Sequence, residues 1–450
     1  MERRTFLKIL SSAGIVSLVS PTFAMEVCKN KVSKSSSALL ESAFRNPPFS
    51  SGVYTWWHWM NGNITKDGIT RDLEAMKANG IAGYQLFEAG SGIPIGPVES
   101  LSDEWVDLIL HTLKESERLG LEFAMHNCPG WSSSGGPWIT PDKAMQIITW
   151  SETKITGGKQ VRIQLPTPKH MFDYYIDTYC LAIPANMKVI PRLSILELSN
   201  RLDKDGVLTW DVPTGEWLIM RFGQTAKDQK NKSAPSKSTG LDCDKFSTEA
   251  LDYHLNCMFK RLMPTMEKIA KHSKIGLLID SYETGDQDWT SDMPAYFEQS
   301  HGYELYPFLP VLANKIVESE ESTKRFLFDF RRVRADMFAE RYYGHFQKRC
   351  KEKGIITYTE PYGGNMMEEL QVAQQLDINM GEFWCGQTVL WANYKYNRTV
   401  KQVASIVHTL GGKVVGAEAF TSEPDADKWL QYPYALKSLG DYMFTRGLSR

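Results

Sequence analysis

The chain has 450 residues, 42% of them hydrophobic and 23% charged, which is ordinary for a globular protein and leaves room for a large barrel with an additional segment. A formal net charge of −2 provides no basic surface for nucleic acid, and no run after the N-terminus reaches the length of a membrane span. We therefore expect neither nucleic acid nor a bilayer as a partner.

The first 24 residues have the layout of an export signal. Arg3 and Arg4 precede an apolar stretch over Ile9–Val19, and Ala24 is the small residue expected before a cleavage point. The twin arginines, followed by Thr-Phe-Leu-Lys, are similar to the twin-arginine export pattern. We expect residues 1–24 to be removed and the protein to be periplasmic or secreted in a bacterium. Residues 25–45, polar and Ser-rich over Asn30–Leu40, are predicted to form a linker.

Short apolar runs that end in aromatic, His, amide or acidic residues alternate with helical patterns, which predicts an α/β fold of the (β/α)8 TIM-barrel type. Amphipathic helices are expected over Asp67–Asn79 and over Ser102–Leu119, where Ser102 is the N-cap and Gly120 the stop. The predicted strands are Val53–Trp59, Gly83–Glu88, Leu121–Asn127, Ile275–Glu283, Ile355–Tyr362, Ile378–Trp384 and Lys413–Phe420. The chain ends where an eighth strand should begin, so we expect a barrel lacking its last strand.

The regular alternation stops at about Gly157. Short strand-like segments follow, with turns at Asp205-Gly206 and Thr214-Gly215, which predicts a small antiparallel β domain inserted after the third barrel strand. We assign residues 46–156 and 239–450 to the barrel and residues 157–238 to the inserted domain with its return loop. Long helices are expected over Ser247–His272 and Glu321–Lys353. The seven cysteines lack CxxC spacing, so zinc is not indicated and most should be buried thiols.

Glutamates stand at the ends of several predicted strands, namely Glu283, Glu360, Glu382 and Glu418, with Glu88 as a fifth. Cleavage of a glycosidic bond requires one protonated carboxyl for the leaving oxygen and a second carboxylate that activates water or attacks the sugar carbon. Partly desolvated acids that lie close together can hold the two different protonation states. Any one of them could instead be a salt-bridged structural acid, but together they indicate a catalytic site.

Stacking rings beside amide, imidazole and carboxyl groups are the combination that a sugar pocket requires. Alternation along the first strand places Trp57 and Trp59 on one face and His58 on the other, so we expect two of its three Trp residues, counting Trp56, to be packing residues. The predicted substrate-binding residues are His58, Asn61, Glu88, His126, Asn127, Trp131, Asp280, Tyr282, Glu360 and Trp384. The expected ligand is a carbohydrate.

Several blocks of the chain, in order from about Asn46 to Arg450, resemble family 106 glycoside hydrolases, the α-L-rhamnosidases. These blocks are NPPFSSGVYTWWHWMNGNIT, HNCPGWSSSGGPWITPDKAM, PTGEWLIMRFGQT with GLDCDKFS, LLIDSYETGDQDWT with HGYELYPFLP, and GAEAFTS followed by PYALKSLGDYMFTRGLSR. The resemblance implies that Glu283 is the general acid and Glu418 the general base of an inverting reaction that removes terminal α-L-rhamnose. It also implies a calcium ion that contacts the sugar hydroxyls, with Glu382 as a ligand.

Two features depart from this family or stay open. Members usually continue past the barrel into β-rich domains, so substrate contacts from such domains are not among the predicted residues. Glu382 could serve as the base in place of Glu418. A retaining barrel glycosidase and a sugar-binding protein without turnover are the alternative hypotheses.

Overall fold

The computed structural model describes residues 34–131, 134–385, 390–422 and 428–450, so the predicted export signal lies outside the described residues. The chain forms two compact units, residues 1–52 and 53–450.

The first unit contains the helix α3 (Lys34–Arg45) and a short 3-10 turn over Phe49–Ser51. The predicted linker therefore includes a helix, which Glu41 and Arg45 support with an ion pair one turn apart at 3.0 Å. Its apolar side chains Leu39, Leu40 and Phe44 are exposed.

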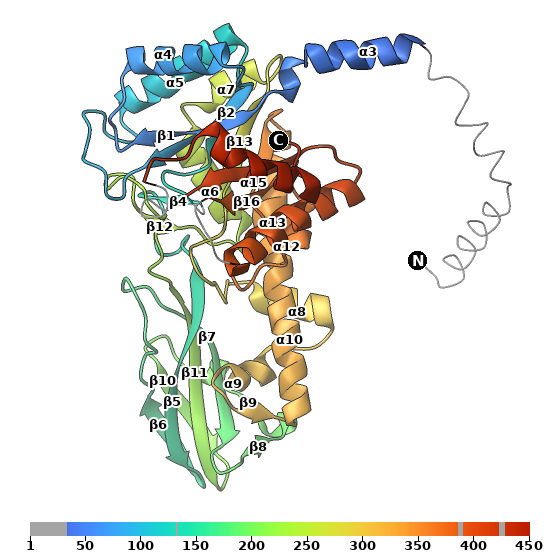
Figure 1. Ribbon diagram of the computed structural model, residues 1–450. Helices are drawn as coiled ribbons and strands as arrows, with labels where there is room; N and C mark the ends of the chain where they lie inside the picture. Colours follow the sequence, from blue (N-terminus) through green and yellow to red (C-terminus); the bar gives the residue numbers. More distant parts are fainter. Residues whose placement is uncertain (1–33, 132–133, 386–389, 423–427) are drawn as a thin grey trace, which may run out of the picture. The chain divides into compact units, whose positions relative to one another are not determined.

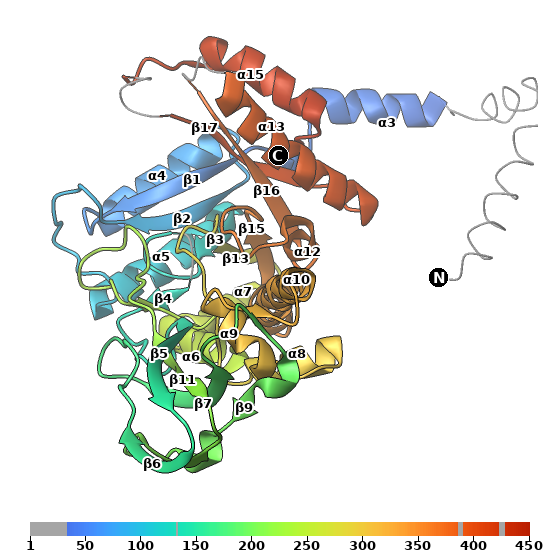
Figure 2. The ribbon, with the colours of Figure 1, turned by 90° about the horizontal axis from the view of Figure 1, so that it is seen from below.

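A curled sheet of seven parallel strands organises the second unit (Figures 1 and 2). Its strands, in spatial order, are β1 (Tyr54–Met60), β2 (Gly83–Ala89), β3 (Glu122–His126), β13 (Ile275–Ile279), β15 (Ile356–Thr359), β16 (Ile378–Trp384) and β17 (Val415–Thr421). All seven predicted strands are confirmed. Among the described residues no ladder joins β17 to β1, so the sheet is a curled half-barrel, and the predicted (β/α)8-type barrel lacking its last strand is confirmed only as far as this parallel half-barrel.

The helices that follow β1 and β2 begin and end as their sequences predict. They are α4 (Lys66–Ala78) and α5 (Asp103–Leu119). Ser102 Oγ accepts a hydrogen bond from the Trp105 amide at 3.1 Å, and Gly120 ends α5 with φ of 65°.

The predicted helix over Ser247–His272 is broken into α6 (Thr248–Phe259) and α7 (Met263–Ile269), because Pro264 suits only the first turn of a helix. The predicted helix over Glu321–Lys353 is continuous, passing from α10 (Glu320–Met337) through a π-helical segment (Phe338–Gly344) into α11 (His345–Lys351). The remaining helices are α8 (Met293–His301), α9 (Leu309–Leu312), α12 (Glu369–Ala373), α13 (Leu390–Thr409) and α15 (Pro433–Arg446).

Antiparallel strands lie in the sequence between β3 and β13 (Figure 1). Four form one sheet in the order β5 (Gln146–Thr156), β11 (Glu216–Ala226), β7 (Ile176–Pro184) and β9 (Leu196–Glu197), and β10 (Val207–Val212) pairs with β6 (Lys159–Gln164). Two-residue strands make two further pairs. The pair of β4 (Gly135–Gly136) with β12 (Leu241–Asp242) is antiparallel, whereas the pair of β8 (Val189–Ile190) with β14 (Ile316–Val317) is parallel, and β14 follows β13 in the sequence. The four-stranded antiparallel sheet starts at Gln146, before the predicted boundary at residue 157, and it belongs to the same compact unit as the parallel sheet.

The two faces of the parallel sheet have different neighbours. We call inner face the side that carries the buried cluster of Phe87, Ala124, Leu278, Tyr358 and Met380. The other, outer face packs against helices in the main core, which includes Trp59, Tyr84 and Leu86 from the strands and Leu73 and Ile109 from α4 and α5. As predicted, Trp57 and Trp59 are packing residues of this outer face.

Of the six cysteines that the structure describes, five are buried. In the described parts of the chain, no helix combines the length and the apolar character that a bilayer crossing requires.

Candidate active site

Acidic side chains gather at the carboxyl ends of four neighbouring strands. Asp280 and Glu283 follow β13, Glu360 follows β15, Glu382 lies in β16 and Glu418 lies in β17. Glu382 and Glu418 are register partners and therefore project from the same face. Ile279 pairs with Thr359 in the adjoining strands, so the next residues, Asp280 and Glu360, are also neighbours. The sequence prediction that these acids meet at one edge of the sheet is in accord with this register.

Burial and nearby negative charge shift Asp280, Glu360 and Glu418 toward their protonated forms. Burial, with the charges of Glu283 and Glu382, raises the pKa of Asp280 to about 7. Burial, with the charges of Asp280, Glu382 and Glu283, raises the pKa of Glu418 to about 8. The pKa of Glu360, which has no exposed surface, is raised well above its usual value by burial and by Asp280 and Glu418. These mutual effects show that all five acids share one electrostatic environment.

Hydrogen bonds orient three of the acids. Tyr362 Oη donates to Glu360 Oε2 at 2.5 Å, Trp384 Nε1 donates to Glu382 Oε1 at 2.5 Å, and Thr421 Oγ1 donates to Glu418. No N–H or hydroxyl donor among the described residues reaches Asp280 Oδ1 or Glu360 Oε1, although both atoms are buried, but the two carboxyls form a hydrogen bond with each other when Glu360 is protonated. Buried oxygens of this kind need a proton, a cation or a ligand hydroxyl as partner.

Glu283 is paired with a cation. Its carboxylate forms an ion pair with Lys232 and accepts a hydrogen bond from Ser281 Oγ at 3.2 Å. Both partners reach solvent, with 52% of the Lys232 side chain and 36% of the Glu283 side chain exposed. Glu283 therefore lies at the rim of the cluster, whereas Glu360 lies at its floor.

Aromatic rings continue the inner face beside the acids. Phe87 lies against Trp56, His58 and His126, with ring centroids 4.4, 5.4 and 5.3 Å away. Trp131 packs against the same inner-face cluster. Of the predicted sugar-binding residues, His58, His126, Trp131, Asp280, Glu360 and Trp384 thus lie on the inner face or beside its acids.

The family is settled by the model of the α-L-rhamnosidase family, glycoside hydrolase family 106, which matches residues 45–177 and 169–450. The chain belongs to glycoside hydrolase family 106.

A curated protein of Formosa agariphila, named "Putative beta-glucuronidase", is 40% identical to this family 106 chain over 442 residues. That match covers 91% of the chain but 37% of the relative, so the chain spans little more than a third of that protein. The fold is similar to that of a rhamnosidase from Novosphingobium sp. PP1Y, with a TM-score of 0.82, 24% identity, and coverage of 91% of this chain and 56% of the solved one.

Two predicted sugar-binding residues of the family 106 chain lie elsewhere. Glu88 is the register partner of Trp59 and projects to the outer face, where Ser100 Oγ donates to its carboxyl at 2.8 Å and burial raises its pKa to about 7. Asn61 forms a turn with φ of 51° and donates through Nδ2 to the Ile93 carbonyl at 2.7 Å. We remove both from the candidate site.

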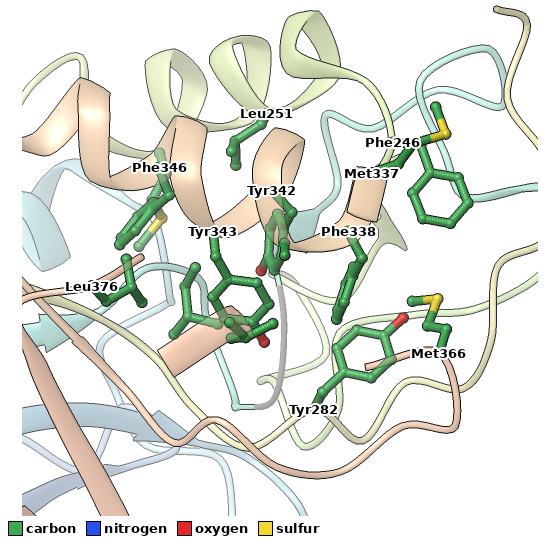
Figure 3. Close-up of a cluster of buried hydrophobic side chains, with 14 of the residues drawn as sticks. Phe246, Leu251, Tyr282, Met337, Phe338, Tyr342, Tyr343, Phe346, Met366 and Leu376 are labelled. Carbon is green, nitrogen blue, oxygen red and sulfur yellow. The ribbon is translucent and has the colours of Figure 1, made fainter. Parts of the chain in front are cut away.

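Asn127 and Tyr282 are also structural. Asn127 is fully buried, its Nδ2 donates to the Leu278 carbonyl at 2.9 Å, and its Oδ1 accepts from Ser134 Oγ at 2.5 Å. Tyr282 is buried in a core cluster with the π-helical segment, where its ring meets that of Phe338 edge to face (Figure 3). Neither side chain is free to meet a sugar, because each is enclosed by packing or by its own hydrogen bonds.

Lys232, Tyr362 and Thr421 contact the acids but were not predicted. Tyr362 and Thr421 lie two and three residues beyond Glu360 and Glu418, so their distance along the chain gives a usable signal. Lys232 lies in the return loop, 51 positions before Glu283, and no local pattern indicates that contact.

Proposed function

We propose that this chain carries the catalytic region of an exported hydrolase that removes terminal α-L-rhamnose from a polysaccharide or glycoconjugate. The observation that carries the proposal is the shared environment of Glu283, which follows β13, and Glu418, which lies in β17 and whose pKa the Glu283 charge helps to raise. Family membership and the aromatic inner face support a carbohydrate as the substrate.

In the proposed reaction, Glu283 donates a proton to the departing glycosidic oxygen while Glu418 takes a proton from a water molecule that attacks the sugar carbon from the opposite face. Glu418 belongs on the water side because it lies deeper among the acids, whereas Glu283 is at the exposed rim where the leaving group departs. Glu283 cannot pair with Lys232 and carry the transferred proton at once, so this ion pair has to open during the reaction.

The inverting mechanism is separable from the retaining alternative by the product. With the full-length protein and an aryl α-L-rhamnoside, we expect release of rhamnose whose first-formed anomer is β, observed by proton NMR before mutarotation. A first-formed α anomer would establish covalent displacement instead. Binding of rhamnosides without any release would favour the sugar-binding hypothesis.

The named relative provides a second substrate class for the same assay. An aryl β-D-glucuronide, tested beside the rhamnoside at equal concentration, distinguishes the two specificities. Faster release of glucuronate than of rhamnose would contradict the rhamnosidase proposal.

We retain calcium in the proposal because of the donor chemistry. Carboxylate oxygens are the ligands that calcium prefers, and Glu382 lies in a cluster that contains two buried carboxyl oxygens, on Asp280 and Glu360, which no described N–H or hydroxyl group reaches. However, the described residues include no group of three His, Cys, Asp or Glu side chains placed to enclose an ion. When bound, calcium would hold sugar hydroxyls and neutralise part of the acidic charge, and no step above depends on it.

Removal of calcium is expected to lower both activity and thermal stability if the ion offsets repulsion among the acids. The measurement is the melting temperature and kcat/KM after treatment with EGTA and after restoring calcium, with Glu382→Gln as the matched variant. Restored calcium should raise the melting temperature of the parent protein and have less effect on Glu382→Gln. Equal responses of the two proteins would remove Glu382 from the metal site.

A further inference from the structure

The ion pair between Lys232 and Glu283 connects two segments that are far apart in the sequence. Lys232 lies in the return loop between β11 and β12, and Glu283 follows β13. The backbone of the loop is fixed at this point, because the Trp131 amide donates to the Lys232 carbonyl at 3.0 Å and the Gly90 amide donates to the Ser233 carbonyl at 2.7 Å. Lys232 therefore projects from a well-anchored backbone.

Gly130 shows how closely the return loop packs against the segment that follows β3. It has φ of +78°, and a Cβ there would lie 2.0 Å from the Lys232 carbonyl oxygen. On the other side, Asn231 Nδ2 donates to the Pro129 carbonyl at 2.9 Å. Since Trp131 packs on the inner face, the anchored loop places an aromatic ring and an ammonium group at neighbouring backbone positions beside the acids.

The charge of Lys232 is unusual in this setting. Asp280, Glu360 and Glu418 form no ion pair with any residue that the structure describes. At these three acids an anionic group of a substrate would therefore find no ion-paired cation among the described residues. At the rim it would meet an ammonium that is half exposed and bound to a single carboxylate.

We propose that Lys232 is a specificity-determining residue that binds the carboxylate of an acidic sugar on the leaving-group side of the scissile bond. Binding exchanges one ion-pair partner for another. The substrate carboxylate takes the place of Glu283 on Lys232, and the released Glu283 becomes available to carry the proton for the leaving oxygen. The release of Glu283 for proton transfer rests on the proposed function. The binding of the substrate carboxylate by Lys232 does not depend on it.

Binding of the carboxylate by Lys232 is tested with a matched pair of ligands, methyl α-D-glucuronide and methyl α-D-glucoside. The first has a carboxylate where the second has a hydroxymethyl group. Titration calorimetry on the full-length protein should show the glucuronide binding roughly 10-fold or more tightly than the glucoside, and Lys232→Met should abolish the difference. Glu283→Gln should bind the glucuronide more tightly than the parent does, because the internal competitor has lost its charge. Lys232→Arg should retain the preference.

Lys237→Met is the control, since Lys237 lies in the same loop, is 70% exposed and is 4.0 Å from Glu99 rather than from any acid of the site. It should leave the ratio of the two affinities unchanged. Equal binding of both ligands by the parent protein, or a glucuronide preference that survives Lys232→Met, would overturn the proposal.

The catalytic half is tested by kcat/KM for rhamnosyl-glucuronate and rhamnosyl-glucose. We expect the ratio to favour the acidic disaccharide by roughly 10- to 100-fold in the parent protein and to fall toward one in Lys232→Met. An equal loss on both disaccharides would reduce Lys232 to a positioning residue for Glu283 and contradict the proposal. If neither disaccharide is cleaved but the calorimetric pattern holds, the proposed function fails while the binding inference stands.

Discussion

Replacing Glu418 with Gln is expected to lower kcat on an aryl α-L-rhamnoside by about 10²–10⁴-fold, because the attacking water then loses its general base. The side chain remains similar in size, and Thr421 Oγ1 can still donate to the amide oxygen, so the fold should be retained. The measurement is kcat with the melting temperature as a check on folding. Wild-type kcat in Glu418→Gln would exclude Glu418 as the base.

External azide distinguishes the base from the other acids. Azide attacks without losing a proton, so it should restore turnover to Glu418→Gln and give the β-rhamnosyl azide. If azide instead rescues Glu382→Gln and leaves Glu418→Gln inactive, the base is Glu382. Glu283→Gln should lose more activity on substrates with poor leaving groups than on a nitrophenyl rhamnoside, because a good leaving group needs less protonation.

The pH dependence of kcat/KM should reflect the ionisation of Glu418. A general base acts in its ionised form, and burial together with Asp280 raises the pKa of Glu418 to about 8. At constant calcium, kcat/KM is therefore expected to rise with pH up to about 8, and this limb should be absent from azide-rescued Glu418→Gln.

Replacing Lys245 with Met is expected to lower the free energy of unfolding by about 3–5 kcal/mol, as for other buried ion pairs that lose one partner. Lys245 and Asp242 form an ion pair in which both side chains are fully buried. Burial alone would lower the pKa of Lys245, but the charge and hydrogen bond of Asp242, together with the nearby Cys243 and Cys128 thiols, offset this effect, so the pKa is raised. Lys245 Nζ also donates to the Cys243 carbonyl at 2.8 Å and lies 5.0 Å from the Tyr342 ring centroid.

Urea unfolding and the melting temperature measure this effect, with Lys437→Met as the matched control. Lys437 pairs with Asp441 on an exposed helix surface, 65% and 58% exposed, and its loss should change stability by less than about 1 kcal/mol. The double change Asp242→Asn with Lys245→Met should be more stable than Lys245→Met alone, since no isolated charge stays buried. Parental stability of Lys245→Met would contradict the assigned role.

The sequence was most informative where periodicity extends over a whole element. The parallel strands were found because each is a short apolar run followed by polar residues, and α5 was found because Ser102 and Gly120 mark its two ends. The strand β5 was missed, although Pro141 and Asp142 form a turn a few residues before Gln146 and could have marked its start. The break between α6 and α7 could have been predicted from Pro264.

The candidate site was predictable to the same extent. Acids at the ends of parallel strands must meet, because those ends share one edge of the sheet. Glu88 could have been excluded by alternation, since it is one position from the inner-face residue Phe87. Asn127 and Tyr282 could not have been excluded in this way, because both lie beyond the end of a strand, where the alternation of side chains stops. Lys232 depends on how a distant loop docks against Trp131, which no local pattern encodes.

The strands β16 and β17 carry both acids and core residues. Glu382 and Glu418 project from one side of the two strands, and hydrophobic side chains such as Phe383 and Phe420 contact each other in the neighbouring cluster. A single-residue insertion in either strand would exchange the two sides and remove the acid from its partners. In the return loop, the side chain at position 232 is not needed to hold the backbone in place, because the contacts of the loop with Gly90 and Trp131 are made by backbone atoms. Natural variation can therefore change which neighbouring sugar is accepted, by altering the side chain at position 232, without disturbing the bond-breaking groups.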